Sequence, residues 1–147
     1  MRRPPTLKTT EIFASVQGEG LRQGEPTVFV RLAGCNLRCG FCDTKKAWRD
    51  GRELPVARIV DEVVRLQRGL PAAWVCLTGG EPLAQDVRPL IDALHEEGFL
   101  VQIETNGTFP PDPRADWITV SPQPPDYDVH PGFVKRDAVA WFASHRH

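Results

Sequence analysis

The sequence predicts an α/β fold in which helices cover the faces of a parallel β-sheet. Three observations carry this prediction: apolar, β-branched segments alternate with amphipathic helical ones, their order is βαβαββ, and polar motifs follow the strand ends. Alternating strands and helices imply parallel strands joined by helical crossovers. Sheets and barrels of this kind bind ligands at the carboxyl ends of their strands. We therefore expect a site where the strand ends meet.

The first half of the chain predicts one strand and one helix. The segment Thr27 to Ala33, TVFVRLA, is β-branched and apolar and stops at Gly34, directly before a cysteine-rich stretch. A helix is predicted in PVARIVDEVVRLQRG, where Pro55 precedes and Gly69 follows a set of apolar residues at helical spacing: Val56, Ile59, Val60 and Val63.

The second half predicts three strands and one helix. Trp74 to Leu77 is a short apolar strand that ends in TGGEP. A helix follows, with Pro89 in its first turn, Gly98 after its end and one apolar face: Val87, Leu90, Ile91 and Leu94. Phe99, Val101 and Ile103 alternate toward ETNGT, and Trp117 to Val120 forms a strand that ends at Ser121-Pro122-Gln123.

Composition limits the classes of partner. The 147 residues are 41% hydrophobic and 25% charged, which predicts one globular domain spanning residues 1–147. The 18 basic and 19 acidic residues are spread along the chain, so neither a nucleic-acid nor a membrane partner is expected. The sequence shows neither a secretory leader nor a long apolar span, so we predict a cytoplasmic protein with reduced thiols.

The stretch GCNLRCGFCDT holds three of the four cysteines: Cys35, Cys39 and Cys42. Three thiolates can hold a four-iron cluster and leave one iron open to another ligand. A structural zinc site normally has four protein ligands, so zinc is an alternative that needs a histidine such as His130. An electron-carrying ferredoxin would need a fourth thiolate, and Cys76, inside the apolar WVCL, is predicted to be a buried core thiol.

The C-x3-C-x2-C motif with Phe41 before its last cysteine resembles the radical S-adenosylmethionine superfamily. TEIFASVQGEG, VRLAGCNLRCGFCDT, TGGEP, ETNGT and SP, in that order, resemble the 7-carboxy-7-deazaguanine synthase family over roughly Thr10 to Pro122. The resemblance implies a partial (β/α) barrel of radical SAM type. It also implies a lyase that converts 6-carboxy-5,6,7,8-tetrahydropterin to 7-carboxy-7-deazaguanine with loss of ammonia, in queuosine and deazapurine biosynthesis. The implied cofactors are a [4Fe-4S] cluster, S-adenosylmethionine and Mg²⁺.

Matching positions carry the family's roles onto this chain. Cys35, Cys39 and Cys42 match the cluster ligands, and Thr44 matches the Mg²⁺ ligand. The pterin contacts match Val16, Gln17, Gly18, Arg31 and Thr78, with Arg31 suited to a two-donor contact with the substrate carboxylate. The S-adenosylmethionine pocket matches Phe41, Cys42, Asp43, Gly80, Ser121, Pro122 and Gln123. Glu104 matches a residue proposed to move substrate protons, and Arg31 is grouped with it as catalytic.

Other interpretations of these residues stay open from the sequence. Asp43-Thr44 is also typical of a helix cap. Arg31 could be a surface strand charge, Glu104 a solvated strand end and Gly79-Gly80 a tight strand exit. Gln123 also departs from the family, which has lysine there. Two other functions remain: an activase of glycyl-radical enzymes, which does not account for TEIFASVQGEG or ETNGT, and a truncated non-catalytic iron–sulfur protein.

The C-terminal part of the family fold is expected to be missing, because family members are longer and only GFVKRDAVAWFASHRH follows SPQPPDYDVHP. The shortened fold would expose a strand edge and apolar surface. We therefore expect a homodimer that buries the apolar residues of the last segment: Phe133, Val139, Trp141 and Phe142. The remaining expected partners are the pterin and a flavodoxin- or ferredoxin-type electron donor.

Overall fold

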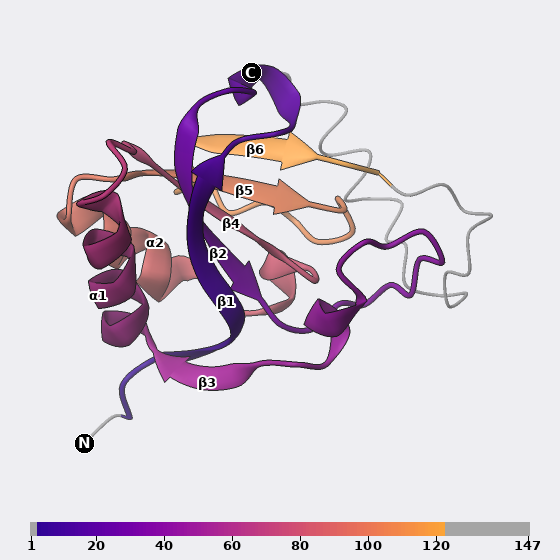
Figure 1. The fold of residues 1–147 in the computed structure, drawn as a ribbon. Coiled ribbons are helices and arrows are strands. Elements are labelled where there is room, and N and C mark those ends of the chain that lie inside the picture. Colours follow the sequence, from indigo (N-terminus) through magenta and orange to yellow (C-terminus); the bar gives the residue numbers. More distant parts are fainter. Residues whose placement is uncertain (1–2, 123–147) are drawn as a thin grey trace.

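A computed structural model describes residues 3–122, which form a six-stranded sheet with two α-helices (Figure 1). The strands are β1 (Thr6–Val16), β2 (Pro26–Leu32), β3 (Arg52–Pro55), β4 (Trp74–Gly79), β5 (Leu100–Thr105) and β6 (Trp117–Val120). The helices are α1 (Val56–Gln67) and α2 (Arg88–Glu96), with 3-10 turns η1 (Gly20–Arg22), η2 (Lys45–Trp48) and η3 (Pro82–Ala84). Among these described residues no helix is long and apolar enough to cross a membrane.

The sheet is mixed rather than wholly parallel, which corrects the prediction. Its order is β3-β1-β2-β4-β5-β6, with β2, β4, β5 and β6 parallel and β1 antiparallel to both of its neighbours. β1 and β3 were not predicted, because their segments TLKTTEIFASV and RELP mix charged residues into the strand pattern. The cysteine motif therefore follows the second strand of the fold and not the first.

Both helices lie on one face of the sheet, whereas helices had been expected on both faces (Figure 1). Their predicted apolar residues pack there, and Leu90, Ile91 and Leu94 of α2 are fully buried. Pro55 precedes α1, and Pro89 lies in the first turn of α2, where the missing N–H breaks no helical hydrogen bond. The two predicted helices are confirmed, and together they make one hydrophobic core with the sheet.

Strand side chains alternate between this core and the opposite face. The core side of β2, β4 and β5 is apolar: Val28, Val30, Leu32, Val75, Leu77, Val101 and Ile103. The opposite side carries different chemistry: Phe29, Arg31, Cys76, Thr78, Gln102 and Glu104. The strand register brings Cys76 beside Gln102 and Arg31 beside Thr78. Polar and reactive side chains thus share the helix-free face.

Candidate active site

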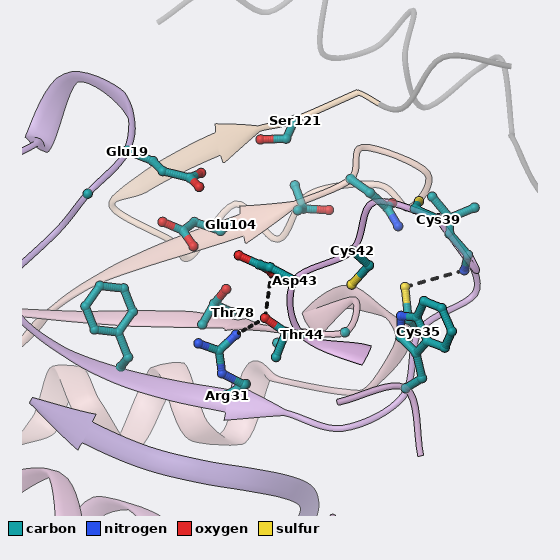
Figure 2. A pocket seen from close by; sticks show the side chains of 18 of the residues that line it. Glu19, Arg31, Cys35, Cys39, Cys42, Asp43, Thr44, Thr78, Glu104 and Ser121 are labelled. Atoms are coloured by element: carbon teal, nitrogen blue, oxygen red, sulfur yellow. Dashed lines mark hydrogen bonds between the residues drawn. The ribbon is translucent and has the colours of Figure 1, made fainter. Parts of the chain in front are cut away.

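A cavity of about 580 Å³ opens on the helix-free face at the carboxyl ends of the parallel strands (Figure 2). It brings together most of the residues that the sequence singled out: Val16, Gln17, Gly18, Arg31, Cys35, Cys39, Phe41, Cys42, Asp43, Thr44, Thr78, Gly80, Glu104 and Ser121. Pro122 is exposed and does not line the cavity. Gln123, His130 and the predicted dimer residues lie outside the described part of the chain.

The three clustered cysteines all line this cavity with free thiols. Burial raises the pKa of Cys35, which the hydrogen bond from Leu37 N and the charge of Arg38 partly oppose. Burial also raises the pKa of Cys39, and the charge of Cys42 raises it to a smaller extent. Within residues 3–122, no group of three His, Cys, Asp or Glu side chains is arranged to hold a single metal ion. Three thiols in one cavity are a donor set that a four-iron cluster can use, because each thiolate binds a separate iron.

Arg38, inside the motif, stabilises the cysteine loop, a role that the sequence analysis missed. Its Nη1 donates to the backbone oxygens of Cys35 at 2.5 Å and Leu37 at 2.7 Å. The guanidinium also lies 5.3 Å from the ring centre of Trp48, within the range of a cation–π contact. A basic residue inside a loop has no periodicity to reveal its partners, so only the folded loop identifies this role.

Gly79 and Gly80 place TGGEP against the cysteine loop. Gly80 N donates to Leu32 O at 3.0 Å, and Glu81 N donates to Gly34 O at 2.8 Å. A Cβ at position 79 would lie 2.1 Å from Leu32 O, and one at position 80 would lie 2.0 Å from Gly34 O. The two glycines do end a strand, as the simpler interpretation expected, but they also allow a backbone contact that any side chain would prevent.

Two polar connections tie the ETNGT segment to the neighbouring motifs. Asn36 donates to Thr108 Oγ1 at 2.9 Å, and Asn106 donates to Asn36 Oδ1 at 3.1 Å. Glu81, which is fully buried, accepts from the Thr105 hydroxyl and from Asn106 N. The motifs alone assign no role to Asn36, Glu81, Thr105 or Asn106. Because these residues lie far apart in the chain, the sequence does not show the contacts between them that fix the cavity wall.

Arg31 and Thr44 meet at one side of the cavity (Figure 2). Arg31 Nη1 donates to Thr44 Oγ1 at 3.1 Å, and that hydroxyl donates to Asp43 Oδ1 at 2.8 Å. Arg31 Nε lies 2.9 Å from Glu11 Oε1, an ion-pair distance without hydrogen-bond alignment. Thr44 occupies the N-cap position of η2, yet its side chain makes no capping hydrogen bond. The hydroxyl therefore faces the site rather than the helix end.

Glu104 projects into the cavity from β5 (Figure 2). Its Oε1 accepts a 3.0 Å hydrogen bond from Gln17 Nε2, and Gln17 is a buried residue of the cavity wall. Cys76 is fully buried, as predicted, but it belongs to this polar face and not to the helix-packed core. Burial raises the pKa of Cys76 well above its usual value, and the carboxylate of Glu104 raises it further.

Comparison with known proteins agrees with this geometry. The family model described as "Radical SAM superfamily" matches residues 29–130. A 7-carboxy-7-deazaguanine synthase from Bacteroides thetaiotaomicron is 47% identical over 132 residues, covering 90% of this chain and 68% of that protein. One from Hyperthermus butylicus is 42% identical over 153 residues, covering 92% of this chain and 63% of that protein.

A solved structure gives the same picture. The crystal structure of QueE from Escherichia coli matches with a TM-score of 0.73 and 28% identity, covering 95% of this chain and 75% of that one. This match confirms the predicted α/β class. The chain nevertheless spans only 48% of the matching synthase from Methanospirillum hungatei and 63% of the one from Hyperthermus butylicus.

Proposed function

The chain belongs to the radical SAM superfamily and, within it, to the family of 7-carboxy-7-deazaguanine synthases, and from this membership we propose its reaction. The resemblance predicted from the motifs is confirmed, as is the partial barrel that it implied. We propose that the protein converts 6-carboxy-5,6,7,8-tetrahydropterin to 7-carboxy-7-deazaguanine and releases ammonia. One observation carries the proposal: a single cavity holds the three cysteines together with Arg31, Gln17 and Glu104.

Cys35, Cys39 and Cys42 would hold the [4Fe-4S] cluster. Three thiols in one cavity are the donor set that such a cluster needs, and Cys76 lies elsewhere on the sheet, between Phe29 and Gln102. When bound and given one electron by a reductant, the cluster and S-adenosylmethionine would supply a 5′-deoxyadenosyl radical for hydrogen-atom abstraction. The chain's own residues bind the reactants, exclude water and move protons.

Residues on two sides of the cavity would bind S-adenosylmethionine. Phe41, Asp43, Gly80 and Ser121 line the cavity around the cysteines, which supports the roles that the family match gave them. Phe41 is 58% exposed, so its ring has surface to give to an adenine. The proposed contacts of Pro122 and Gln123 rest on the sequence alone.

Arg31 would bind the substrate carboxylate. Its side chain is mostly buried and reaches the cavity beside Thr44, where a guanidinium can donate two hydrogen bonds to a carboxylate. The Thr44 hydroxyl lies at the same place and is a suitable ligand for Mg²⁺, which keeps waters and shares substrate oxygens. Thr78, the strand neighbour of Arg31, lines the same side. The simple surface-charge interpretation of Arg31 is not favoured by this burial.

Glu104 would hold and move substrate protons. Gln17 donates to its Oε1, and the carboxylate lines the cavity, where it can meet a substrate. Ring contraction and loss of ammonia require proton transfers that a radical cannot perform. Val16 and Gly18 line the cavity on either side of Gln17, which supports their proposed contact with the pterin.

We also propose a redox partner, a homodimer and a cytoplasmic location. Lys45 and Arg49 are exposed beside the cysteine loop, where an acidic flavodoxin- or ferredoxin-type donor would approach. Among the described strands β6 pairs with β5 alone, and an open edge favours a second subunit. Reduced thiols, which the cytoplasm maintains, are required by the cysteine site.

Anaerobic turnover tests the function. Reconstituted protein with 6-carboxytetrahydropterin, S-adenosylmethionine, Mg²⁺ and dithionite should yield 7-carboxy-7-deazaguanine, measured by mass spectrometry. Arg31→Lys should raise KM, because lysine keeps the charge but loses the two-donor fork. Cleavage of S-adenosylmethionine without the deazaguanine would contradict the proposal and favour a non-catalytic cluster protein. The names of the matched relatives favour the synthase over the activase.

A further inference from the structure

We infer that Arg22 is a positioning residue for this active site: through Gln102 it fixes the direction in which Gln17 donates to Glu104. Arg22 lies in η1, outside the cavity lining, and nothing in the family motifs marks it. The structural role of Arg22 stands on its own contacts, and its effect on catalysis rests on the proposed function. We call Gln17, Cys76, Gln102 and Glu104 the pocket floor: Gln17 and Glu104 line the cavity, and Cys76 and Gln102 are buried beside them on the same face of the sheet.

Arg22 is almost completely buried against the pocket floor. Its Nη1 donates to Gln102 Oε1 at 2.9 Å, and its guanidinium carbon lies 3.4 Å from the ring centre of Trp74. Its Nη2 donates to Glu25 Oε2 at 2.6 Å, on the half-exposed side. A buried guanidinium is costly unless its donors are satisfied, so this site is specifically built around it.

Arginine can only donate hydrogen bonds, and this sets the orientation of Gln102. The carbonyl oxygen of Gln102 must face Arg22, and its amide nitrogen then donates to Thr119 Oγ1 at 3.1 Å. The reverse orientation would place an NH₂ group against the guanidinium. Arg22 therefore fixes which of the two amide orientations Gln102 adopts, whereas an isolated amide could adopt either.

The fixed oxygen of Gln102 in turn orients Gln17. Gln17 Nε2 donates to Gln102 Oε1 at 3.2 Å and to Glu104 Oε1 at 3.0 Å, and Cys76 Sγ lies 3.9 Å away, so its nitrogen faces three acceptors. Its own Oε1 accepts from Glu19 N at 3.0 Å. One amide thus holds the carboxylate on β5 and the backbone of the Gln17–Glu19 segment, which forms a wall of the cavity.

The network leads toward the reacting end of the site. Arg22, Gln102 and Gln17 are each buried, and the last hydrogen bond ends on the carboxylate that projects into the cavity. Losing the Arg22 donor would let Gln102 turn over, and Gln17 would then lose an acceptor beside Glu104. Glu104 would sample more orientations, while the cysteine loop, on the other side of the cavity, would keep its own contacts.

The test compares Arg22→Met with Arg22→Lys and with Glu25→Gln. Methionine keeps an apolar stem over Trp74 but has no donor, lysine keeps a charged donor, and Glu25→Gln changes only the outer partner of Arg22. Arg22→Met should lower kcat for the pterin about tenfold, the scale of one hydrogen bond used in the transition state. Its iron content and its cleavage of S-adenosylmethionine without pterin should not change. The other two variants should stay within about twofold of the wild type.

A second readout does not depend on turnover. In ¹⁵N-labelled, metal-free full chain, the side-chain amide signals of Gln17 and Gln102 should shift and exchange faster with solvent in Arg22→Met, and stay in place in Glu25→Gln. Gln102→Met, which removes the intermediate amide, should reproduce the loss in kcat if Arg22→Met does not fold.

Unchanged amide signals and normal kcat in Arg22→Met would overturn the inference. Equal losses in iron, S-adenosylmethionine cleavage and kcat would overturn it too, by showing a general structural role. If the wild type makes no deazaguanine, the proposed function fails and the amide signals still decide the structural part.

Discussion

The Thr105 hydroxyl donates a 2.8 Å hydrogen bond to the carboxylate of Glu81, and both residues are buried. This contact joins TGGEP at the end of β4 to ETNGT at the end of β5, two segments that both border the cavity. Burial raises the pKa of Glu81, which the hydrogen bonds to its carboxylate oppose. The fold tolerates this buried carboxyl group because its two oxygens accept hydrogen bonds from three donors.

Glu81→Gln should therefore destabilise the fold. The Glu81 carboxylate accepts from Leu83 N at 3.0 Å and from Asn106 N at 2.8 Å as well as from Thr105. An amide nitrogen on either side would face a donor, so we expect a loss of about 1–3 kcal/mol in the free energy of unfolding. Urea denaturation measures it, with the exposed Glu96→Gln as the control. Equal stability of the two variants would show that Glu81 does not hold the motifs together.

The cysteine assignment predicts opposite results for two buried thiols. Cys39→Ala should abolish the oxygen-sensitive four-iron cluster of anaerobically reconstituted protein, because it removes one of three thiolates in the cavity. Cys76→Ala should leave the iron content nearly unchanged, since Cys76 contacts Gln17 rather than the cysteine loop. Iron analysis and the visible absorption spectrum measure both. Cluster loss in Cys76→Ala with retention in Cys39→Ala would reverse the assignment.

Gly80→Ala should destabilise the protein and impair cluster loading together. The new methyl group would lie 2.0 Å from Gly34 O and 3.0 Å from Cys35 N, so the cysteine loop must move. We expect a loss of about 1–3 kcal/mol, the usual range for overpacking, and less iron per chain. Gly69→Ala is the matched control, because its Cβ would lie 3.8 Å from Leu66 O. A Gly80→Ala protein that loads iron normally would show that this backbone contact can relax.

Asp116 should make stability depend on acid pH. Burial alone would raise its pKa, but hydrogen bonds from Val101 N at 2.7 Å and with His95 at 2.8 Å lower it below the usual 3.8. A lowered folded pKa means that the carboxylate stabilises the fold above pH 3.8 and that this contribution is lost as the pH falls through the folded value. Asp116→Asn should be less stable than wild type at pH 6, and the difference should shrink below pH 3.8. Asp50→Asn is the control, and a gap that stays constant down to acid pH would contradict the assignment.

The sequence predicted those parts of the fold that repeat with a regular period. Val56, Ile59 and Val63 identify α1 because helical spacing is visible in the chain, and all three are buried. The strand β1 was missed because TLKTTEIFASV is long, partly exposed and interrupted by charges. Helices on both faces were expected from the βα order alone, but both connecting helices pack on one side. The hydrophobic period and the order of the elements show which segments are strands and which are helices. Packing of the helices decides which face of the sheet they cover.

The site was predictable where motifs carry its chemistry, and not where contacts between motifs support it. The cysteines, Arg31 and Glu104 stand at strand ends, so topology alone brings them to one edge. Arg22 and Gln102 lie 80 positions apart and share no motif, so only the fold reveals their hydrogen bond. Cys76 looked like a core residue because its neighbours in the chain are apolar, although its side chain faces Gln17.

Thr44→Ala should weaken the response to Mg²⁺ without loss of iron. The Thr44 hydroxyl lies between Arg31 Nη1 and Asp43 Oδ1, at the place where the substrate carboxylate and a hard cation would meet. Removing it takes away the proposed metal ligand and one partner of Arg31, so half-maximal turnover should require several times more Mg²⁺. Thr44→Ser keeps the hydroxyl and should behave like the wild type, which separates loss of the ligand from loss of the methyl group. An unchanged Mg²⁺ dependence in Thr44→Ala would leave the hydroxyl with the lesser role of orienting Arg31, and a KM measurement for the pterin would then show the effect instead.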